Sequence, residues 1–499
     1  MMSKNNQLLI GGNGSQTVYM DSSMANRHGM VAGATGTGKT VTLQILAENF
    51  SKAGVPVFLA DVKGDVSGIG KPATAHPKID ERIDTIGIDG YQMSGNPVVF
   101  WDVFGKKGHP IRTTVSEIGP LLLSNLLDLN DTQTGILYSC FKIADDQGML
   151  ILDLKDLRSM LVWMGDNRKD LKAEYGNIST ASIGAIQRGL IVLEEQGAEF
   201  FLGEPAIELR DLMANDFSGR GVINILDSNT LLQKSPKLYS TFLLWLLSEL
   251  FESLPEVGDA DKPKFVMFFD EAHLLFDGAP KVLVDKIEQV VRLIRSKGVG
   301  IYFISQSPLD VPEEILGQLG LKIQHALRAF TPKDQKAVKT VAETFRANPE
   351  LDTGQVITEL GVGEALVSTL DSEGIPTQVE RILIRPPESR IGPMNSNERK
   401  EQIERSPYRG RYDKTLDRES AYEMLISRAE KNAAQEEQLA REEELRELEE
   451  ARSKTSSSRK RRSTRQTPTE AFVKSAARAI GSQLGRRVIR GILGSLFRG

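Results

Sequence analysis

The fold is decided by the stretch Gly33-Ala34-Thr35-Gly36-Thr37-Gly38-Lys39-Thr40. A short apolar run, residues 30–32, precedes it, and an amphipathic segment that begins at Val41 follows it. This order predicts a strand, a glycine-rich loop and a helix. In such a loop the glycines let successive backbone N–H groups turn toward one anion, and the positive end of the helix adds to the attraction.

The same stretch predicts a phosphate site. Residues 33–41 would surround the phosphates of a nucleotide, with Lys39 reaching the β- and γ-phosphates and the Thr40 hydroxyl binding Mg²⁺. The alternative is a glycine-rich turn that binds no ligand. The strand expected before the loop and the helix expected after it favour the phosphate site.

Charge is distributed unevenly along the chain. The 499 residues carry a formal net charge of −5, yet residues 451–499 hold thirteen Lys and Arg side chains against one acid, Glu470. The C-terminal segment is therefore expected to be electrostatically distinct from the rest. The length allows a large core and at least one further module.

The cysteine content and the apolar segments indicate the compartment. Cys140 is the only cysteine, which excludes an intrachain disulfide and a cysteine-based zinc site and fits a reducing environment. The first residues lack an apolar signal core, and the most apolar window, residues 242–247, is too short to cross a bilayer. We expect a cytoplasmic protein without an integral membrane segment.

Apolar runs alternate with helical patterns, which predicts an α/β fold with a mostly parallel sheet covered on both faces. A small hairpin is expected over residues 8–20 and helices over 41–50, 236–252 and 280–297. The strands expected after the loop cover residues 55–61, 97–102, 222–227, 264–271, 298–306, 321–330, 365–370 and 377–385. In such a sheet, ligands bind at the carboxyl ends of the strands.

Changes in composition and in hydrophobic periodicity divide the chain into segments. A hairpin lead-in (1–24) precedes the first part of the P-loop core (25–109), a helical insertion (110–215), the second part of the core (216–388) and a charged tail (389–499). The prolines after Arg385 mark the start of the tail. The tail is expected to hold an acidic helix over 415–453, a disordered basic linker and a terminal amphipathic basic segment, residues 472–497. In the insertion, Asp131 or Thr132 is expected to cap a helix.

An acid pair supplies the next candidates for chemistry. Asp270 ends an apolar strand and could bind Mg²⁺ through water, while Glu271 beside it could polarise an attacking water. A pair of acids at a helix N-terminus is the alternative, since negative charge is favourable there. His273 follows, and a packing or hydrogen-bonding role is at least as good an interpretation for it as a catalytic one.

Two more polar residues follow strands. Gln306 ends the strand after that of Asp270, so it could contact the γ-phosphate or the water and report the nucleotide state. Its alternative role is to cap the turn before Pro308. Asp61, also at a strand end, could touch the metal or a partner subunit, or could be an ordinary loop acid.

Hydrolysis of a phosphoanhydride also benefits from an arginine, often donated by a neighbouring subunit. The candidates are Arg328, in an expected strand beyond Gln306, Arg295, near the end of the helix after Glu271, and Arg292 on that helix. For each of them a surface salt bridge is an equally good interpretation. The sequence does not separate these alternatives.

Taken together, these motifs resemble those of a known group. The loop at 33–40, Asp61-Val62-Lys63-Gly64-Asp65, Phe-Asp-Glu-Ala-His at 269–273, the run from Arg295 to Gln306, and Leu327-Arg328 resemble the ordered motifs of the HerA/FtsK group of P-loop ATPases. The similarity is greatest to the bacterial HerA-like family that includes the protein called YjgR, and it covers residues 25–385. It implies a RecA-like fold, ATP with Mg²⁺, a catalytic glutamate beside the Walker B aspartate, and often a hexameric ring that moves double-stranded DNA.

Two functions are compatible with these features. The first is an oligomeric ATP-driven translocase or helicase-like ATPase on double-stranded DNA, with the basic tail adding phosphate contacts. The alternative is an ATP-dependent switch or motor that acts on a protein partner through the tail. Residues 472–497 could also lie on a membrane surface or dock on the core, because basic side chains accompany their apolar ones.

Overall fold

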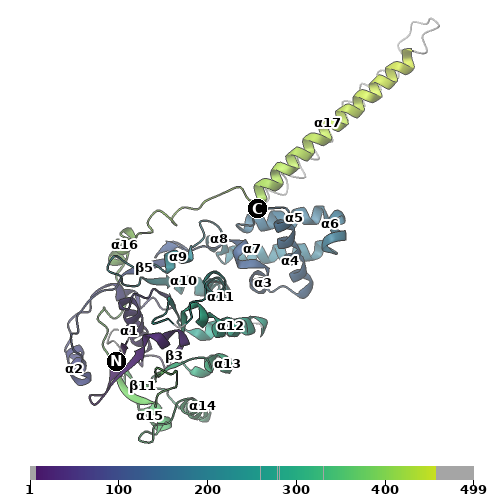
Figure 1. Cartoon of the computed structure of the whole chain (residues 1–499). Helices are drawn as coiled ribbons and strands as arrows, with labels where there is room; N and C mark the ends of the chain where they lie inside the picture. Colours follow the sequence, from purple (N-terminus) through teal and green to yellow (C-terminus); the bar gives the residue numbers. More distant parts are fainter. Residues whose placement is uncertain (1–6, 259, 278, 280, 330, 457–499) are drawn as a thin grey trace. The chain divides into compact units, whose positions relative to one another are not determined.

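One sheet of 12 strands organises the fold, in the order β2-β1-β12-β11-β10-β3-β9-β8-β4-β7-β5-β6. The computed structural model describes residues 7–456 except 259, 278, 280 and 330 (Figure 1). The strands are β1 (Gln7–Gly12), β2 (Thr17–Asp21), β3 (Gly29–Ala32), β4 (Val57–Asp61), β5 (Val98–Asp102), β6 (His109–Pro110), β7 (Ile223–Asp227), β8 (Phe265–Phe269), β9 (Val299–Ser305), β10 (Leu321–Gln324), β11 (Glu364–Ser368) and β12 (Glu380–Ile384).

The sheet is mostly parallel, which confirms the prediction from the sequence. Neighbouring strands run parallel from β10 across to β6, whereas β11, β12, β1 and β2 form an antiparallel edge. Every residue of β3, β4, β5, β7, β8 and β9 is buried, as expected for strands covered on both faces. The hairpin of β1 and β2 is also confirmed, and it extends this edge, where Gly11 pairs with Ile384.

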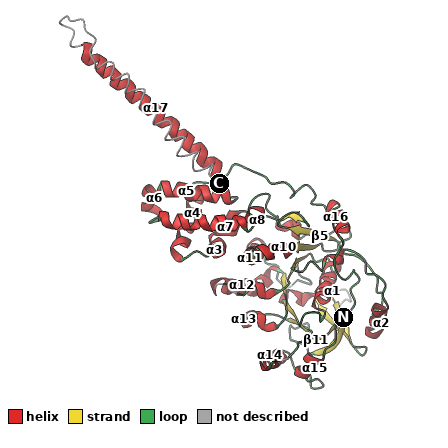
Figure 2. Ribbon diagram, turned by 180° about the vertical axis from the view of Figure 1, so that it is seen from behind, coloured by secondary structure: helices red, strands yellow, loops and turns green. Residues whose placement is uncertain are grey.

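Helices cover both faces of the sheet (Figures 1 and 2). On one face α1 packs Leu46 and Phe50 into a core with Leu59 of β4, and on the other face α11 and α12 pack against Phe58 and Phe303. The helices are α1 (Lys39–Lys52), α2 (Pro77–Ile86), α3 (Val115–Leu126), α4 (Asp131–Asp146), α5 (Leu154–Asp166), α6 (Arg168–Tyr175), α7 (Thr180–Glu195), α8 (Ala198–Phe201), α9 (Leu209–Leu212), α10 (Asn229–Lys234), α11 (Pro236–Ser253), α12 (Lys281–Ile294), α13 (Glu313–Leu316), α14 (Pro332–Glu343), α15 (Thr353–Glu359), α16 (Ser396–Glu404) and α17 (Ala421–Ser456).

The segment between β6 and β7 is helical, as the spacing of its apolar residues predicts, and Figure 1 shows α3 to α7 gathered in one group. The expected cap of α4 is wrong. Asn130 caps this helix, since its Oδ1 accepts a hydrogen bond from Gln133 N at 3.0 Å while Gln133 Oε1 accepts one from Asn130 N at 3.1 Å. Asp131 and Thr132 are the first helical residues instead. Reciprocal bonding of this kind satisfies two backbone donors at once, which is why it prevails over a single cap.

The first compact unit of the chain continues to Leu425, beyond the boundary expected at residue 388. Residues after 388 are joined to it by aromatic and polar contacts. The rings of Tyr408 and Tyr412 lie 5.5 and 5.4 Å from that of Trp101, centroid to centroid, and Arg399 lies over the Phe100 ring at 4.5 Å. Such contacts leave no periodic apolar pattern, so the sequence did not reveal them. The remaining segment boundaries stay predictions.

The second unit comprises residues 426–499. Its described part belongs to α17, which confirms a helix in the region expected to be acidic and helical. Its side chains between residues 435 and 451 are exposed, as expected for a solvated helix. The terminal amphipathic segment expected over 472–497 lies outside the described residues.

Candidate active site

The glycine-rich loop connects β3 to α1, as predicted, and its neighbours fix it on two sides. Gly33 N donates to Ser305 O at 3.3 Å and Ala34 N donates to Ala326 O at 2.8 Å. Gly33 has a φ of +153°, and a Cβ there would come within 2.5 Å of the His325 Cβ, so a larger residue does not fit. The loop is therefore held between the ends of β9 and β10.

The helix after the loop has an open N-terminus. Gly38 precedes α1 with a φ of +118°, and no side chain caps the first turn. Thr35 and Gly36 are exposed. Backbone N–H groups at the start of a helix of 14 residues are therefore available to an anion.

The Lys39 side chain folds back into the glycine-rich loop that precedes it. Its Nζ donates to Gly33 O at 2.6 Å and to Ala34 O at 3.2 Å, and the residue is 6% exposed. Burial, reinforced by the nearby Lys63, lowers the pKa of Lys39. A partly desolvated ammonium with only neutral carbonyl partners gains from an approaching anion.

The acid pair follows β8 directly, since this strand ends at Phe269. Asp270 is partly exposed, but desolvation of its carboxyl raises its pKa to about 7. The backbone of Glu271 is left-handed, with φ +49° and ψ +52°. The alternative of an acid pair at a helix N-terminus is met only in part: Glu271 precedes the short 3-10 helix Ala272–Leu275, and its side chain makes no cap hydrogen bond to that helix.

The Glu271 carboxylate is held at one oxygen. Lys63 Nζ lies 2.7 Å from Oε1, and His273 Nδ1 lies 3.5 Å from Oε2. Within the described part of the chain, Oε2 is buried without a hydrogen-bond partner. Burial opposes ionisation, but the contact with Lys63 outweighs it and the pKa of Glu271 is lowered. Glu271 is thus an ionised acid whose Oε2 lies near His273 but accepts no hydrogen bond from the described residues.

Asp61 shapes the loop that carries Lys63. It ends β4, its Oδ1 accepts from Gly64 N at 2.7 Å and its Oδ2 accepts from Val66 N at 3.3 Å. Burial raises the pKa of Asp61 to about 6. Of the roles that the sequence left open, this geometry favours the loop acid, because both carboxylate oxygens already have partners in the same loop.

Gln306 lies between the phosphate loop and the acid pair. It follows β9, which pairs with β3 on one side and with β8 on the other, and its side chain is exposed. Ser307, rather than Gln306, caps the turn at Pro308, because the Ser307 side chain accepts a hydrogen bond from Leu309 N. The Gln306 amide therefore remains available at the carboxyl edge of the sheet.

Arg328 lies at the same edge, although not in a strand. The expected strand over 321–330 ends at Gln324, because the backbone after it bonds the phosphate loop through Ala326 O. Arg328 is exposed in the following segment.

Arg295 and Arg292 lie elsewhere. Both line a cavity of about 530 Å³ at the amino ends of the parallel strands, opposite the phosphate loop. Three more basic side chains line this cavity: Arg27, Lys322 and Arg346. Arg295 and Arg292 are therefore remote from the acid pair of their own chain, a separation that the sequence did not reveal.

His325 is a neighbour of the loop that the sequence did not single out. Its Nε2 lies 2.8 Å from Thr42 Oγ1 and its Nδ1 lies 2.8 Å from Glu364 O. Burial lowers its pKa to about 4, so the ring is neutral, with Nδ1–H donating to the carbonyl and Nε2 accepting from the hydroxyl. His325 thereby joins the first turn of α1 to β11. Only its place at the end of an apolar run could have signalled this role.

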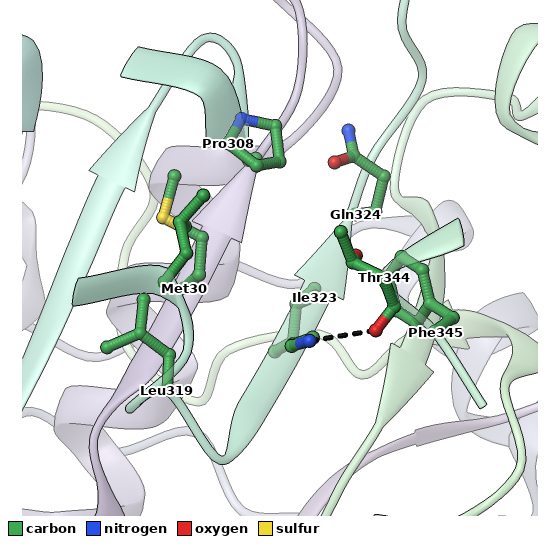
Figure 3. Close-up of a pocket in the computed structure, with 10 residues that line it drawn as sticks. Met30, Pro308, Leu319, Ile323, Gln324, Thr344 and Phe345 are labelled. Carbon is green, nitrogen blue, oxygen red and sulfur yellow. Dashed lines mark hydrogen bonds between the residues drawn. The ribbon is translucent and has the colours of Figure 1, made fainter. Parts of the chain in front are cut away.

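A second cavity, of about 30 Å³, lies beside β3 and β10 (Figure 3). Met30, Leu319 and Ile323 line it, and Lys322 Nζ donates to Thr344 O at 2.8 Å. Gln324 also lines it, with a buried Oε1 that has no partner among the described residues. This volume suits one or two water molecules rather than a nucleotide.

Comparison with known families gives one match that covers almost the whole chain. The family described as helicase HerA-like C-terminal matches residues 6–499.

Curated relatives point in the same direction. A probable helicase, MJECL08, from Methanocaldococcus jannaschii is 31% identical over 125 residues, which are 24% of this chain and 22% of the relative. The DNA double-strand break repair helicase HerA from Sulfolobus acidocaldarius is 22% identical over 350 residues, 68% of this chain and 62% of the relative. The chain thus spans less than two thirds of the length of each of these relatives.

Solved structures confirm the fold. The plasmid coupling protein TrwB in complex with a non-hydrolysable GTP analogue has a TM-score of 0.52 at 15% identity, over 78% of this chain and 91% of that chain. TrwB in complex with ADP and Mg²⁺ has a TM-score of 0.51 at 16% identity, over 78% and 94%. This similarity, with the parallel sheet and its loop, identifies the fold as the RecA-like P-loop fold.

Proposed function

The chain belongs to the helicase HerA-like C-terminal family, and on this premise we propose that it is an oligomeric motor that hydrolyses ATP with Mg²⁺ and moves on double-stranded DNA. One observation carries the proposal. The neighbouring parallel strands β3, β9 and β8 bring Lys39, Gln306 and the Asp270–Glu271 pair together at the carboxyl ends of these strands. Phosphoryl transfer to water needs these components: a phosphate cradle, a metal-organising acid and a group that orients water.

The residues fit ATP and Mg²⁺. The cradle is formed by the open N-terminus of α1 and by the loop from Gly33 to Gly38, and Lys39 supplies a cation. Thr40 and Asp270 would hold the metal, whose remaining ligands would be phosphate oxygens and water. The described residues contain no cluster of three or more His, Cys, Asp or Glu side chains placed to bind a metal by themselves. This fits a metal that arrives with its nucleotide.

The bound metal supplies neutralisation of phosphate charge. Glu271, whose Oε2 accepts no hydrogen bond from the described residues, accepts a proton from the attacking water, and Gln306 contacts that water or the γ-phosphate. Arg328 stabilises charge within the same chain. Arg295 lines the basic cavity at the amino ends of the parallel strands and is therefore remote from the nucleotide site of its own chain. We assign it to the nucleotide bound by a neighbouring copy. A ring of six copies, as the family resemblance implies, would provide that neighbour.

DNA as the partner is supported by the name of one relative, a DNA double-strand break repair helicase, and the other relative is named a probable helicase. No helix in the described part of the chain is long and apolar enough to cross a membrane. Cys140, free and buried, fits the reducing environment of the cytoplasm.

The test is steady-state ATPase activity with and without duplex DNA, on protein whose oligomeric mass is measured with and without nucleotide. We expect Mg²⁺-dependent turnover that duplex DNA stimulates, and a decrease of about 100-fold or more in kcat for Lys39→Ala and Glu271→Gln. Lys169→Met, an exposed change on α6, serves as the control and should behave as wild type.

Two outcomes would count against the proposal. Turnover that survives Lys39→Ala and Glu271→Gln would exclude this site as the source of the activity. Turnover that depends on both residues, yet is unchanged by duplex DNA over a range of lengths at low salt, would retain the ATPase and favour the alternative, a switch or motor acting on a protein through the tail.

A further inference from the structure

Lys63 lies on the short segment between β4 and the 3-10 helix Ser67–Gly70, and this segment is closed by the two hydrogen bonds that Asp61 accepts. The lysine crosses to the next strand along the sheet, where its Nζ lies 2.7 Å from Glu271 Oε1. No role in hydrolysis has yet been given to this contact.

Glu271 is held in an unfavourable backbone conformation. A φ of +49° lies in the left-handed region, which crowds the Cβ of a residue with a side chain, so surrounding contacts must stabilise it. The Lys63 contact restrains Oε1, whereas Oε2 is buried, accepts no hydrogen bond from the described residues and lies 3.5 Å from His273 Nδ1. A carboxylate held at one oxygen, whose other oxygen can still accept a hydrogen bond, has the arrangement that orienting a water molecule requires.

We propose that Lys63 is a positioning residue for hydrolysis, which holds Glu271 by Oε1 so that Oε2 faces the attacking water. This inference rests on the proposed ATPase function. Lys63 acts through Glu271 and differs in this respect from Lys39, whose ammonium contacts the phosphate loop itself.

The exposed fractions of the two side chains indicate that the Lys63–Glu271 pair adds little to the stability of the fold. The Lys63 side chain is 41% exposed and that of Glu271 10% exposed. An ion pair with one partner largely in water contributes much less to folding than a pair that is buried on both sides. Removing the Lys63 charge should therefore leave the protein folded, and its effect on turnover should exceed its effect on stability.

The test uses the full chain and combines kinetics with a double-mutant cycle. For Lys63→Met we expect kcat to decrease about tenfold or more while KM for ATP with Mg²⁺ stays within about twofold, as for loss of a contact needed only in the transition state. Lys63→Arg keeps the positive charge and should retain most of the wild-type rate. Lys63→Gln removes the charge, as Lys63→Met does, and should show the same decrease in kcat. In a Glu271→Gln background, Lys63→Met should have no further effect. Lys169→Met is the matched control on an exposed helix.

A second measurement does not need turnover. In nucleotide-free protein, we expect backbone hydrogen exchange of residues 269–275 to be faster in Lys63→Met than in wild type, and Lys63→Arg to match wild type.

The inference is overturned if kcat of Lys63→Met equals or exceeds that of wild type, if KM rises at constant kcat, or if the change further slows Glu271→Gln. Unchanged exchange in residues 269–275 would also overturn it. Absence of turnover in wild type would instead count against the proposed function, and the exchange measurement would still decide the role of Lys63.

Discussion

Asp270 carries a carboxyl that the folded protein makes harder to ionise. Desolvation raises its pKa to about 7 from the ordinary 3.8. Between these values the folded state binds a proton more readily than the unfolded chain, so the stability that the neutral carboxyl provides is lost as the pH rises through this window. At pH 8 without metal, the ionised Asp270 therefore destabilises the fold.

We expect Asp270→Asn to raise Tm by a few degrees at pH 8 and by less at pH 5, because the amide stays neutral at both values. Thermal unfolding without nucleotide or Mg²⁺ measures the difference, with the exposed Asp166→Asn as control. An equal change of Tm at both pH values would show that ionisation of Asp270 is not the cause.

At the scale of elements, a buried ion pair joins α1 to the segment after β12. Glu48 on α1 is fully buried, and its carboxylate accepts from Arg385 Nη2 at 3.1 Å and from Ser389 N at 2.8 Å. The Arg385 side chain is only 5% exposed. Removing one partner of such a pair leaves a buried charge uncompensated.

Arg385→Met is therefore expected to lower the free energy of unfolding by about 3–5 kcal/mol. The matched control is Arg381→Met on β12, four residues before Arg385. Arg381 pairs with Glu364 at 2.7 Å, but its side chain is 41% exposed, so the loss should stay within about 1 kcal/mol. Denaturant unfolding compares the two variants, and similar losses would contradict a special role for the buried pair.

At the scale of the whole chain, two candidate ends of the first compact unit can be compared. Ending the chain after Leu425 keeps Tyr408 and Tyr412 against Trp101, whereas ending it after Glu388 removes both rings and exposes the indole. Tyr412 and Trp101 are almost fully buried. Aromatic side chains of this size contribute several kcal/mol when buried.

We expect the chain ending at Leu425 to keep the Tm of the full chain within about two degrees, and the chain ending at Glu388 to unfold at a Tm several degrees lower. Differential scanning calorimetry of both chains measures this. Equal values of Tm would mean that residues 389–425 are dispensable for the fold and that the boundary expected from the prolines is the better one.

Features with a local physical cause could be predicted from the amino-acid sequence. Continuous apolar runs predicted the buried strands, and the glycine spacing before Lys39 predicted the phosphate loop. Asp270, Glu271 and Gln306 could be chosen because each directly follows such a run. Neighbouring residues can offer the same local signal, and there the prediction was wrong. Asn130 caps α4 in place of Asp131 or Thr132, and β10 ends at Gln324, earlier than expected.

How these elements come together follows from the packing of the folded chain. The strand order places β9 between β3 and β8. The parallel direction of β9, β3 and β10 places Arg328 at the carboxyl ends of these strands and Arg295 at their amino ends. The contacts of Lys63 with Glu271 and of Arg385 with Glu48 join residues hundreds of positions apart. Polar contacts of this kind depend on which strands become neighbours, and one sequence read in order carries no periodic signal for that choice.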